Sequence, residues 1–140
     1  MFNSRKDISM NETEKKEGLP SLAGADAREL AMAIADVLDA KKAKDIKVYY
    51  VKEKTVITEY FVVCSGNTGT QVQALAGEVE YKMGGRDVQP YLVEGRDNNA
   101  WILVDYSHVI VHVFSREARD FYNLDRLYED TEVERASSED

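Results

Sequence analysis

A continuous run of apolar side chains from Tyr60 to Cys64 constrains the fold of this chain more than any other segment. A strand with one face in water usually alternates apolar and polar side chains, whereas an unbroken apolar run is typical of a strand buried on both faces. Residues 65–70 follow directly, and their Ser, Gly, Asn and Thr side chains predict a turn into a helix. A buried strand that leads into a helix predicts a sheet covered by helices.

Apolar residues at helical spacing predict two amphipathic helices. The first covers residues 27–42 and begins after Asp26 with a D-x-x-E pattern related to the capping box. The second follows the turn and takes Thr68 or Thr70 as its N-cap. Ser115 is a good N-cap for a third, short helix after the last predicted strand.

Four further segments rich in β-branched and aromatic residues predict strands at residues 46–52, 88–93, 100–104 and 109–114. The element order is then α-β-β-α-β-β-β-α. We therefore predict an α/β fold: a single domain, residues 25–128, with a mixed five-stranded sheet flanked by helices.

The two ends of the chain have a different composition from this core. Residues 1–24 have few apolar side chains and no helical period, which predicts a flexible N-terminal leader, with Met10 as an alternative start. Residues 129–140 are polar and strongly acidic, which predicts a flexible, solvated tail.

The net charge of −8 is concentrated in that tail. Residues 129–140 contribute −5, residues 1–24 sum to zero, and residues 25–128 carry the remaining −3. An acidic balance excludes a protein that coats nucleic acid, because phosphate neutralisation requires a basic face, but it suits a basic protein partner. No apolar run approaches the length of a membrane-spanning helix, and a single cysteine indicates a reducing compartment, most simply the cytosol.

The turn at Gly66 and Gly69 invites comparison with phosphate-binding loops, which also lie between a strand and a helix. No lysine follows it, as the P-loop pattern requires, so a tight turn is the simpler interpretation. The two histidines, His108 and His112, form no cluster with metal-site spacing, and Cys64 lies in the most apolar segment. We therefore expect no catalytic residue, no metal site and no cofactor.

Trp101 is the only tryptophan and follows a polar link at the start of a predicted strand. It is either a core residue or an interface anchor, a role in which tryptophan is enriched. Strand alternation places Trp101, Leu103 and Asp105 on one face, with Ile102 and Val104 on the other. A strand with two apolar faces is either central in its sheet or covered by a partner.

Five segments of the predicted core together carry a resemblance to a known family. They are Thr58–Gly66, Val93–Gly95, Trp101–Tyr106, Val109–Phe114 and the pattern Arg119-x-x-Tyr122-x-Leu124-x-x-Leu127, and they follow the order and spacing of that family. With them, residues 27–128 resemble the ribosomal silencing factor family RsfS, also called Iojap. The resemblance implies a fold like that of nucleotidyltransferases without their catalytic residues, and a protein that is not an enzyme. Gly66 is followed by Asn67 rather than by the serine of those enzymes, and no Asp-x-Asp pair occurs in the chain.

Members of this family bind the fourteenth protein of the large ribosomal subunit, on the face where the small subunit docks. They block subunit joining, repress translation under nutrient limitation, and are often homodimers when free. The resemblance implies a cytoplasmic, ribosome-associated repressor with no membrane association and no direct sequence-specific nucleic-acid binding. Two alternatives remain open: a nucleotidyltransferase-like nucleotide-binding module, and an assembly factor for the large subunit.

The same resemblance gives the partner-binding residues as Glu94, Gly95, Trp101, Leu103, Asp105 and Tyr106. We expect Trp101 and Leu103 to supply apolar contacts. Two carboxylates, Glu94 and Asp105, are expected to meet basic groups of the ribosomal protein.

The chain departs from the family's usual pattern at three places. Glu59 stands where Asp is usual, Ser107-His108 where Gly-Asp is usual, and Tyr128 where Trp is usual. The second departure lies beside the predicted interface, whereas the third keeps an amphipathic aromatic side chain.

Overall fold

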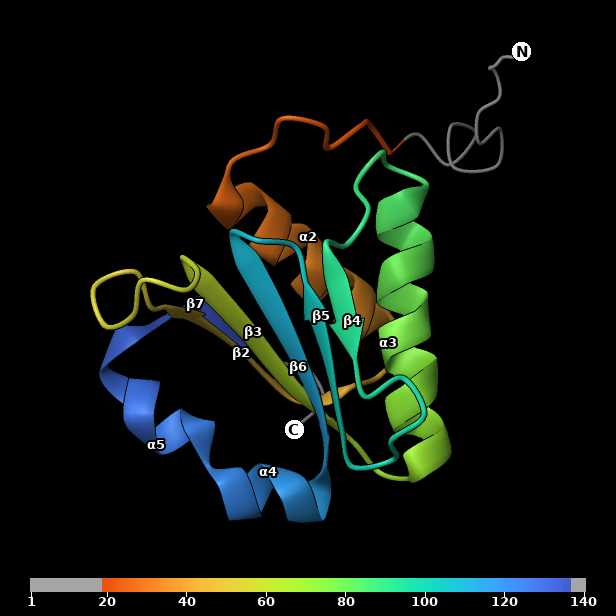
Figure 1. Ribbon diagram of the computed structural model, residues 1–140, viewed down its shortest axis with the longest axis vertical. Coiled ribbons are helices and arrows are strands. Elements are labelled where there is room, and N and C mark those ends of the chain that lie inside the picture. The colour runs from red at the N-terminus through yellow and green to blue at the C-terminus, as the bar shows by residue number, and fades with distance from the viewer. Residues whose placement is uncertain (1–18, 137–140) are drawn as a thin grey trace.

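A mixed β-sheet lies between two pairs of helices in the computed structural model, which describes residues 19–136 (Figure 1). Within this range six strands form one sheet in the order β4-β5-β6-β3-β2-β7. The strands are β2 (Lys44–Tyr50), β3 (Tyr60–Gly66), β4 (Leu92–Glu94), β5 (Trp101–Asp105), β6 (Val109–Ser115) and β7 (Glu132–Ala136). The helices are α2 (Ala27–Ala40), α3 (Gly69–Gly84), α4 (Arg116–Tyr122) and α5 (Leu124–Tyr128), with a 3₁₀ turn, η1 (Glu129–Thr131), before β7.

The predicted central strand is confirmed. Every residue of β3 is buried, and the strand pairs in parallel with β6 and antiparallel with β2. A parallel pair needs a long crossover, which here runs through α3 and the antiparallel strands β4 and β5. The α/β class is therefore confirmed.

The helix starts follow the predicted capping chemistry. The carboxylate of Asp26 accepts a hydrogen bond from the Glu29 amide at 2.8 Å. The Thr68 hydroxyl accepts one from Gln71 at 3.0 Å, and the Ser115 hydroxyl accepts one from Ala118 at 3.1 Å. Each cap satisfies an amide that has no partner inside its helix, an effect worth about 1 kcal/mol.

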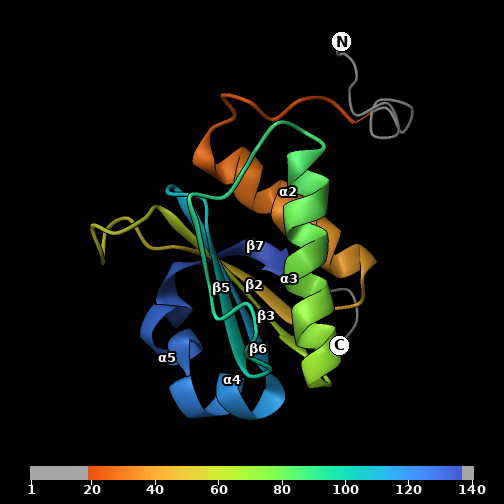
Figure 2. The same ribbon diagram turned by 45° about the vertical axis from the view of Figure 1, so that its right-hand side comes forward.

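The two faces of the sheet are covered unequally (Figure 2). On one face, α2 and α3 enclose the larger core, in which Ile34, Leu38, Val79 and Met83 are wholly inaccessible to solvent. The other face is covered by the short helices α4 and α5 over a smaller cluster, which comprises Tyr49, Val51, Phe61, Val63, Ile110, Phe114 and Ala118. Within residues 19–136 no helix is long and apolar enough to cross a membrane.

The sheet has six strands rather than the five predicted, because part of the expected acidic tail pairs with it. Strand β7 lies antiparallel to β2, and Lys47 forms an ion pair with Glu132 at 3.2 Å. A strand at a sheet edge is held mainly by backbone hydrogen bonds, so a polar sequence can occupy it without an apolar pattern. The prediction of a flexible tail is therefore wrong for residues 129–136, which form η1 and β7, although Glu129, Asp130 and Glu132 are exposed as expected.

The predicted N-terminal leader, residues 1–24, extends too far into the folded part of the chain. Leu22 is buried in the larger core, and its amide donates a hydrogen bond to the Arg86 carbonyl at 2.7 Å. Residues 1–18 of the predicted leader lie outside the described part of the chain. Strand β4 is shorter than predicted, beginning after Pro90, whose backbone lacks an amide proton for the ladder.

Removing β7 is expected to destabilise the domain. A stop after Thr131 should lower the free energy of unfolding by about 1–2 kcal/mol, because β2 loses its outer hydrogen bonds and the Lys47–Glu132 pair. Urea denaturation measures this change. A stop after Ala136, which removes only residues 137–140, is the control, and equal stability of the two truncated chains would contradict a stabilising role for β7.

Candidate functional site

Strands β4 and β5 bring most of the predicted partner-binding residues to one face of the sheet. Glu94 lies opposite Leu103 in the antiparallel ladder, so their side chains point to the same side. Trp101, Leu103 and Asp105 alternate with the buried Ile102 and Val104, as predicted. The shared face is the one that α4 and α5 cover only in part (Figure 2).

Trp101 is partly exposed and is also fixed in place. Its indole Nε1–H donates a hydrogen bond to His112 Nδ1 at 3.1 Å. Its ring centroid lies 5.0 Å from that of Phe114 and 4.5 Å from that of Tyr122. The side chain therefore packs partly on the sheet and stays partly exposed to solvent, and its role as an interface anchor stays a prediction.

Gly95 has a structural role at this site. Its φ of +77° lies in the left-handed region, and a Cβ atom there would meet the Trp101 carbonyl oxygen at 2.5 Å. The turn that it begins is closed by Asn98, whose amide donates to the Gly95 carbonyl at 2.7 Å. The Asn98 side chain then accepts hydrogen bonds from the amides of Ala100 and Trp101, so this turn sets where β5 starts.

His112 lies on β6 diagonally across from Trp101 and is buried. Because its Nδ1 accepts the indole proton, the neutral ring carries its own proton on Nε2, which has no hydrogen-bond partner within residues 19–136. The Phe61 ring stands edge-on to it at a centroid distance of 4.7 Å. Burial lowers the pKa of His112 from 6.5 to about 4, so the ring is neutral at pH 7.

Tyr106 does not join the other predicted site residues. It is buried in the larger core, on the α2–α3 side of the sheet, and burial raises the pKa of its hydroxyl. Its side chain is therefore not accessible to a partner in this structure. Asp105, in contrast, stays partly exposed, and its carboxylate accepts a hydrogen bond from the Ser107 amide at 2.7 Å.

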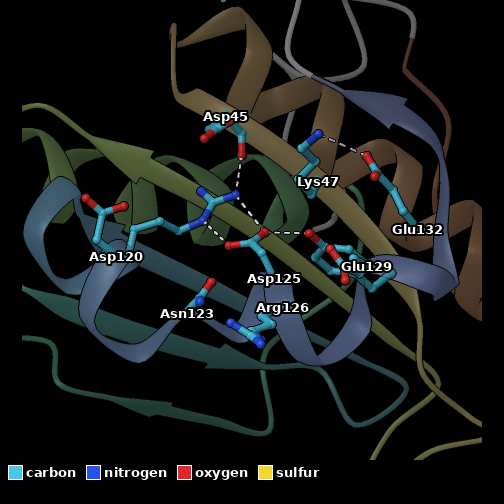
Figure 3. Close-up of a pocket in the computed structure, with 10 residues that line it drawn as sticks. Asp45, Lys47, Asp120, Asn123, Asp125, Arg126, Glu129 and Glu132 are labelled. Atoms are coloured by element: carbon cyan, nitrogen blue, oxygen red, sulfur yellow. Dashed lines mark hydrogen bonds and ion pairs between the residues drawn. The ribbon is translucent and has the colours of Figure 1, made fainter.

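A second feature, a polar cavity of about 670 Å³, lies where α4 and α5 meet β2 and β7 (Figure 3). Its inner wall is the guanidinium of Arg119, whose side chain is almost completely buried. Arg119 donates to the Asp125 carboxylate at 2.6 and 3.0 Å, to the Ser65 hydroxyl at 2.9 Å and to the Asp45 carbonyl at 2.8 Å. The Tyr49 hydroxyl donates to the same Asp125 carboxylate at 2.5 Å.

The two innermost charges of this cavity, those of Arg119 and Asp125, are paired with each other. Burial alone would raise the pKa of Asp125, but hydrogen bonds from Arg119 and Tyr49 outweigh it and hold that pKa below its usual value. The remaining walls carry more carboxylates than basic groups, which disfavours an anionic ligand. We therefore interpret the cavity as the outer side of a structural ion pair.

The turn at residues 66–70 is closed by hydrogen bonds of its own, as the tight-turn interpretation predicts. The Asn67 amide is bonded to the Gln71 side chain at 2.6 Å, and the Gln71 amide to the Thr68 hydroxyl. Asn99 fills the space beside Gly69, where a Cβ atom would lie only 2.6 Å from its side chain. Among residues 19–136 no group of three His, Cys, Asp or Glu side chains is placed to hold a metal ion, and burial raises the pKa of the Cys64 thiol to about 12.

Comparisons of the sequence and of the structure with known proteins agree on one family. Residues 24–140 match the sequence profile of a family described as ribosomal silencing factor during starvation, RsfS. The chain is 38% identical over 96 residues to the ribosomal silencing factor RsfS of Bacillus subtilis, which covers 69% of this chain and 81% of that protein. A crystal structure of a Chromobacterium violaceum protein superposes with a TM-score of 0.71 at 30% identity, covering 74% of this chain and 87% of that one.

A more distant relative is the Mus musculus protein named mitochondrial assembly of ribosomal large subunit protein 1. It is 30% identical over 98 residues, which cover 68% of this chain and 43% of that protein.

Breaking the buried ion pair is expected to cost far more than breaking an exposed one. Arg119→Met leaves Asp125 without its cation, and we expect the free energy of unfolding to fall by about 3 kcal/mol. Lys54→Met removes the exposed pair with Asp130 and should cost far less, because solvent already screens that pair. Urea denaturation of both variants tests the contrast, and similar losses would show that burial of Arg119 is not what matters.

The buried His112 should make stability depend on pH. Its pKa is depressed in the folded state, so the unfolded chain binds the proton first, and stability is lost as pH falls from 6.5 toward 4. Between pH 7 and pH 4.5 we expect a loss of about 2–3 kcal/mol from this group. His112→Phe should lack this component while the exposed His108→Asn keeps it, and parallel pH profiles for wild type and His112→Phe would contradict the assignment.

Proposed function

Because this chain belongs to the RsfS family of ribosomal silencing factors, we propose that it represses translation by binding the large ribosomal subunit. In this proposal it binds the subunit's fourteenth ribosomal protein when nutrients are limited and sterically blocks joining of the small subunit. It acts in the cytoplasm, in association with the ribosome, and is a homodimer when free. The observation that carries the proposal is a partly exposed, rigidly held Trp101 on an incompletely covered sheet face.

The chemistry of that face suits a basic protein surface. Trp101 and Leu103 offer apolar contact, and both are only partly covered by the chain itself. Glu94 is exposed beside Leu103, and the partly exposed Asp105 lies two residues further along β5. Carboxylates around an aromatic anchor favour a partner that carries lysine or arginine.

The proposed mechanism needs occupancy of a surface and no chemical turnover. A protein bound where the small subunit docks prevents joining by excluded volume alone. The proposal therefore assigns this chain no catalytic residue and no cofactor. Gly95 acts indirectly, because it allows the turn that places Trp101 at the start of β5.

A role in assembly of the large subunit is the second candidate. Its support is the name of the mouse relative, a mitochondrial protein of ribosomal large subunit assembly. Sedimentation profiles of a deletion strain separate the two roles. Precursor particles in growing cells indicate assembly, whereas normal subunits with excess joining during starvation indicate silencing.

Truncating the tryptophan should weaken binding to the large subunit. Trp101→Ala removes the apolar anchor, and we expect a loss of about 2 kcal/mol, or roughly 30-fold in Kd. Glu94→Lys, at an exposed position that should leave the fold intact, is expected to weaken binding by reversing a charge. Co-sedimentation with purified large subunits gives both affinities, and a joining assay with small subunits gives the functional effect.

The control is Tyr81→Ala, which truncates an exposed aromatic side chain on α3, at the opposite face of the domain. It should bind and inhibit joining as wild type does. Wild-type affinity of Trp101→Ala would show that the surface is wrongly assigned. Absence of any inhibition by the wild-type protein would overturn the function itself.

A further inference from the structure

Helix α4 ends in two aromatic side chains that the domain leaves in water. Phe121 is 80% exposed and Tyr122 is 48% exposed. The helix buries Ala118 and Arg119 instead, so its inner side already packs on the sheet. Large apolar side chains gathered at one place on a surface commonly mark an interaction site.

These two side chains continue the surface that begins at Trp101. The ring of Tyr122 lies 4.5 Å from that of Trp101, and the ring of Phe121 stands at 90° to Tyr122 with 5.0 Å between centroids. Three rings from β5 and α4 thus form one contiguous row. None of the three is fully buried, and exposure is greatest at Phe121, the end farthest along the row.

Hydrogen bonds fix the position of α4, the helix that carries two of the three rings. Ser115 caps α4, and Arg119 ties the helix to β3 through Ser65 and to β2 through the Asp45 carbonyl. Asn123, in the left-handed conformation at φ 50°, ends the helix directly after Tyr122. A pre-organised row of aromatic rings binds with a smaller loss of conformational entropy than flexible side chains do.

The charges around the row favour a basic partner. Glu117 lies one helical turn before Phe121 and is exposed, so the two side chains are neighbours on α4. The charged residues at accessible positions of β4, β5 and α4 are four acids and one base, namely Glu94, Asp105, Glu117, Asp120 and Arg116. A protein segment that combines an apolar side chain with lysine or arginine complements such a surface.

We propose that Phe121 and Tyr122 form the second half of the partner-binding surface, and that a basic segment of the ribosomal protein binds across both β5 and α4. This inference rests on the proposed function and adds an element outside β4 and β5. Phe121 supplies its exposed face, and Tyr122 both contacts the partner and supports the Trp101 ring.

The test measures the affinity of single-site variants for purified large ribosomal subunits by co-sedimentation. Phe121→Ala should weaken binding at least fivefold without lowering thermal stability, because the side chain is already in water. Tyr81→Ala is the matched control, an exposed aromatic residue on α3 that should bind as wild type does. Glu94→Lys reports on the β4–β5 half of the surface.

A charge pair of variants tests the basic nature of the partner. Phe121→Lys should bind more weakly than Phe121→Glu at low ionic strength, and the difference should shrink at high salt. Equal affinities of the two would overturn a basic segment at α4.

The outcomes separate the two proposals. If Glu94→Lys weakens binding while Phe121→Ala and Tyr122→Ala bind as wild type, α4 is not part of the interface and the proposed function stands. If the wild-type protein does not bind large subunits, the proposed function fails and this inference fails with it. Weakening by Tyr81→Ala equal to that by Phe121→Ala would also overturn a specific contact at α4.

Discussion

The sheet face that α4 and α5 cover only in part depends on one interaction, the buried ion pair and hydrogen bonds of the Arg119 guanidinium. Arg119 lies on α4, and its guanidinium donates hydrogen bonds to Ser65 on β3, to the Asp45 carbonyl on β2 and to Asp125 on α5. Helices of seven and five residues have too little apolar surface to hold their position by packing alone. A buried ion pair whose guanidinium donates four hydrogen bonds gives both helices a fixed position, and that position brings Tyr122 against Trp101.

The parts of the fold that depend on local chemistry were predictable from the sequence. The unbroken apolar run gave the central strand, and the residues at Asp26, Thr68 and Ser115 gave the helix starts. Strand β7 was not predictable, because pairing at an edge uses backbone groups that every residue has. The role of Arg119 was equally hidden, since Ser65 and Asp45 lie 54 and 74 residues away in the chain.

The candidate site was predictable to the extent that strand alternation determines it. Alternation placed Trp101 and Leu103 on one face, and the same rule puts Tyr106 with Ile102 and Val104 on the buried side, where the structure has it. Contacts between distant segments needed the structure. Two departures from the usual family pattern, Glu59 and His108, lie together, with His108 Nδ1 3.5 Å from the Glu59 carboxylate.

The unequal cover of the sheet allows one small domain to have a closed core on one face and a partly exposed aromatic side chain on the other. The α2–α3 face is closed and supplies the larger core, so the other face is free to leave Trp101 partly exposed. The indole N–H of Trp101 then needs a hydrogen-bond acceptor that adds no positive charge beside the carboxylates of Glu94 and Asp105. A charged imidazole would carry a proton on Nδ1 and could not accept the indole N–H. Burial keeps His112 neutral, so it orients Trp101 without placing a positive charge beside the carboxylates of the proposed binding surface.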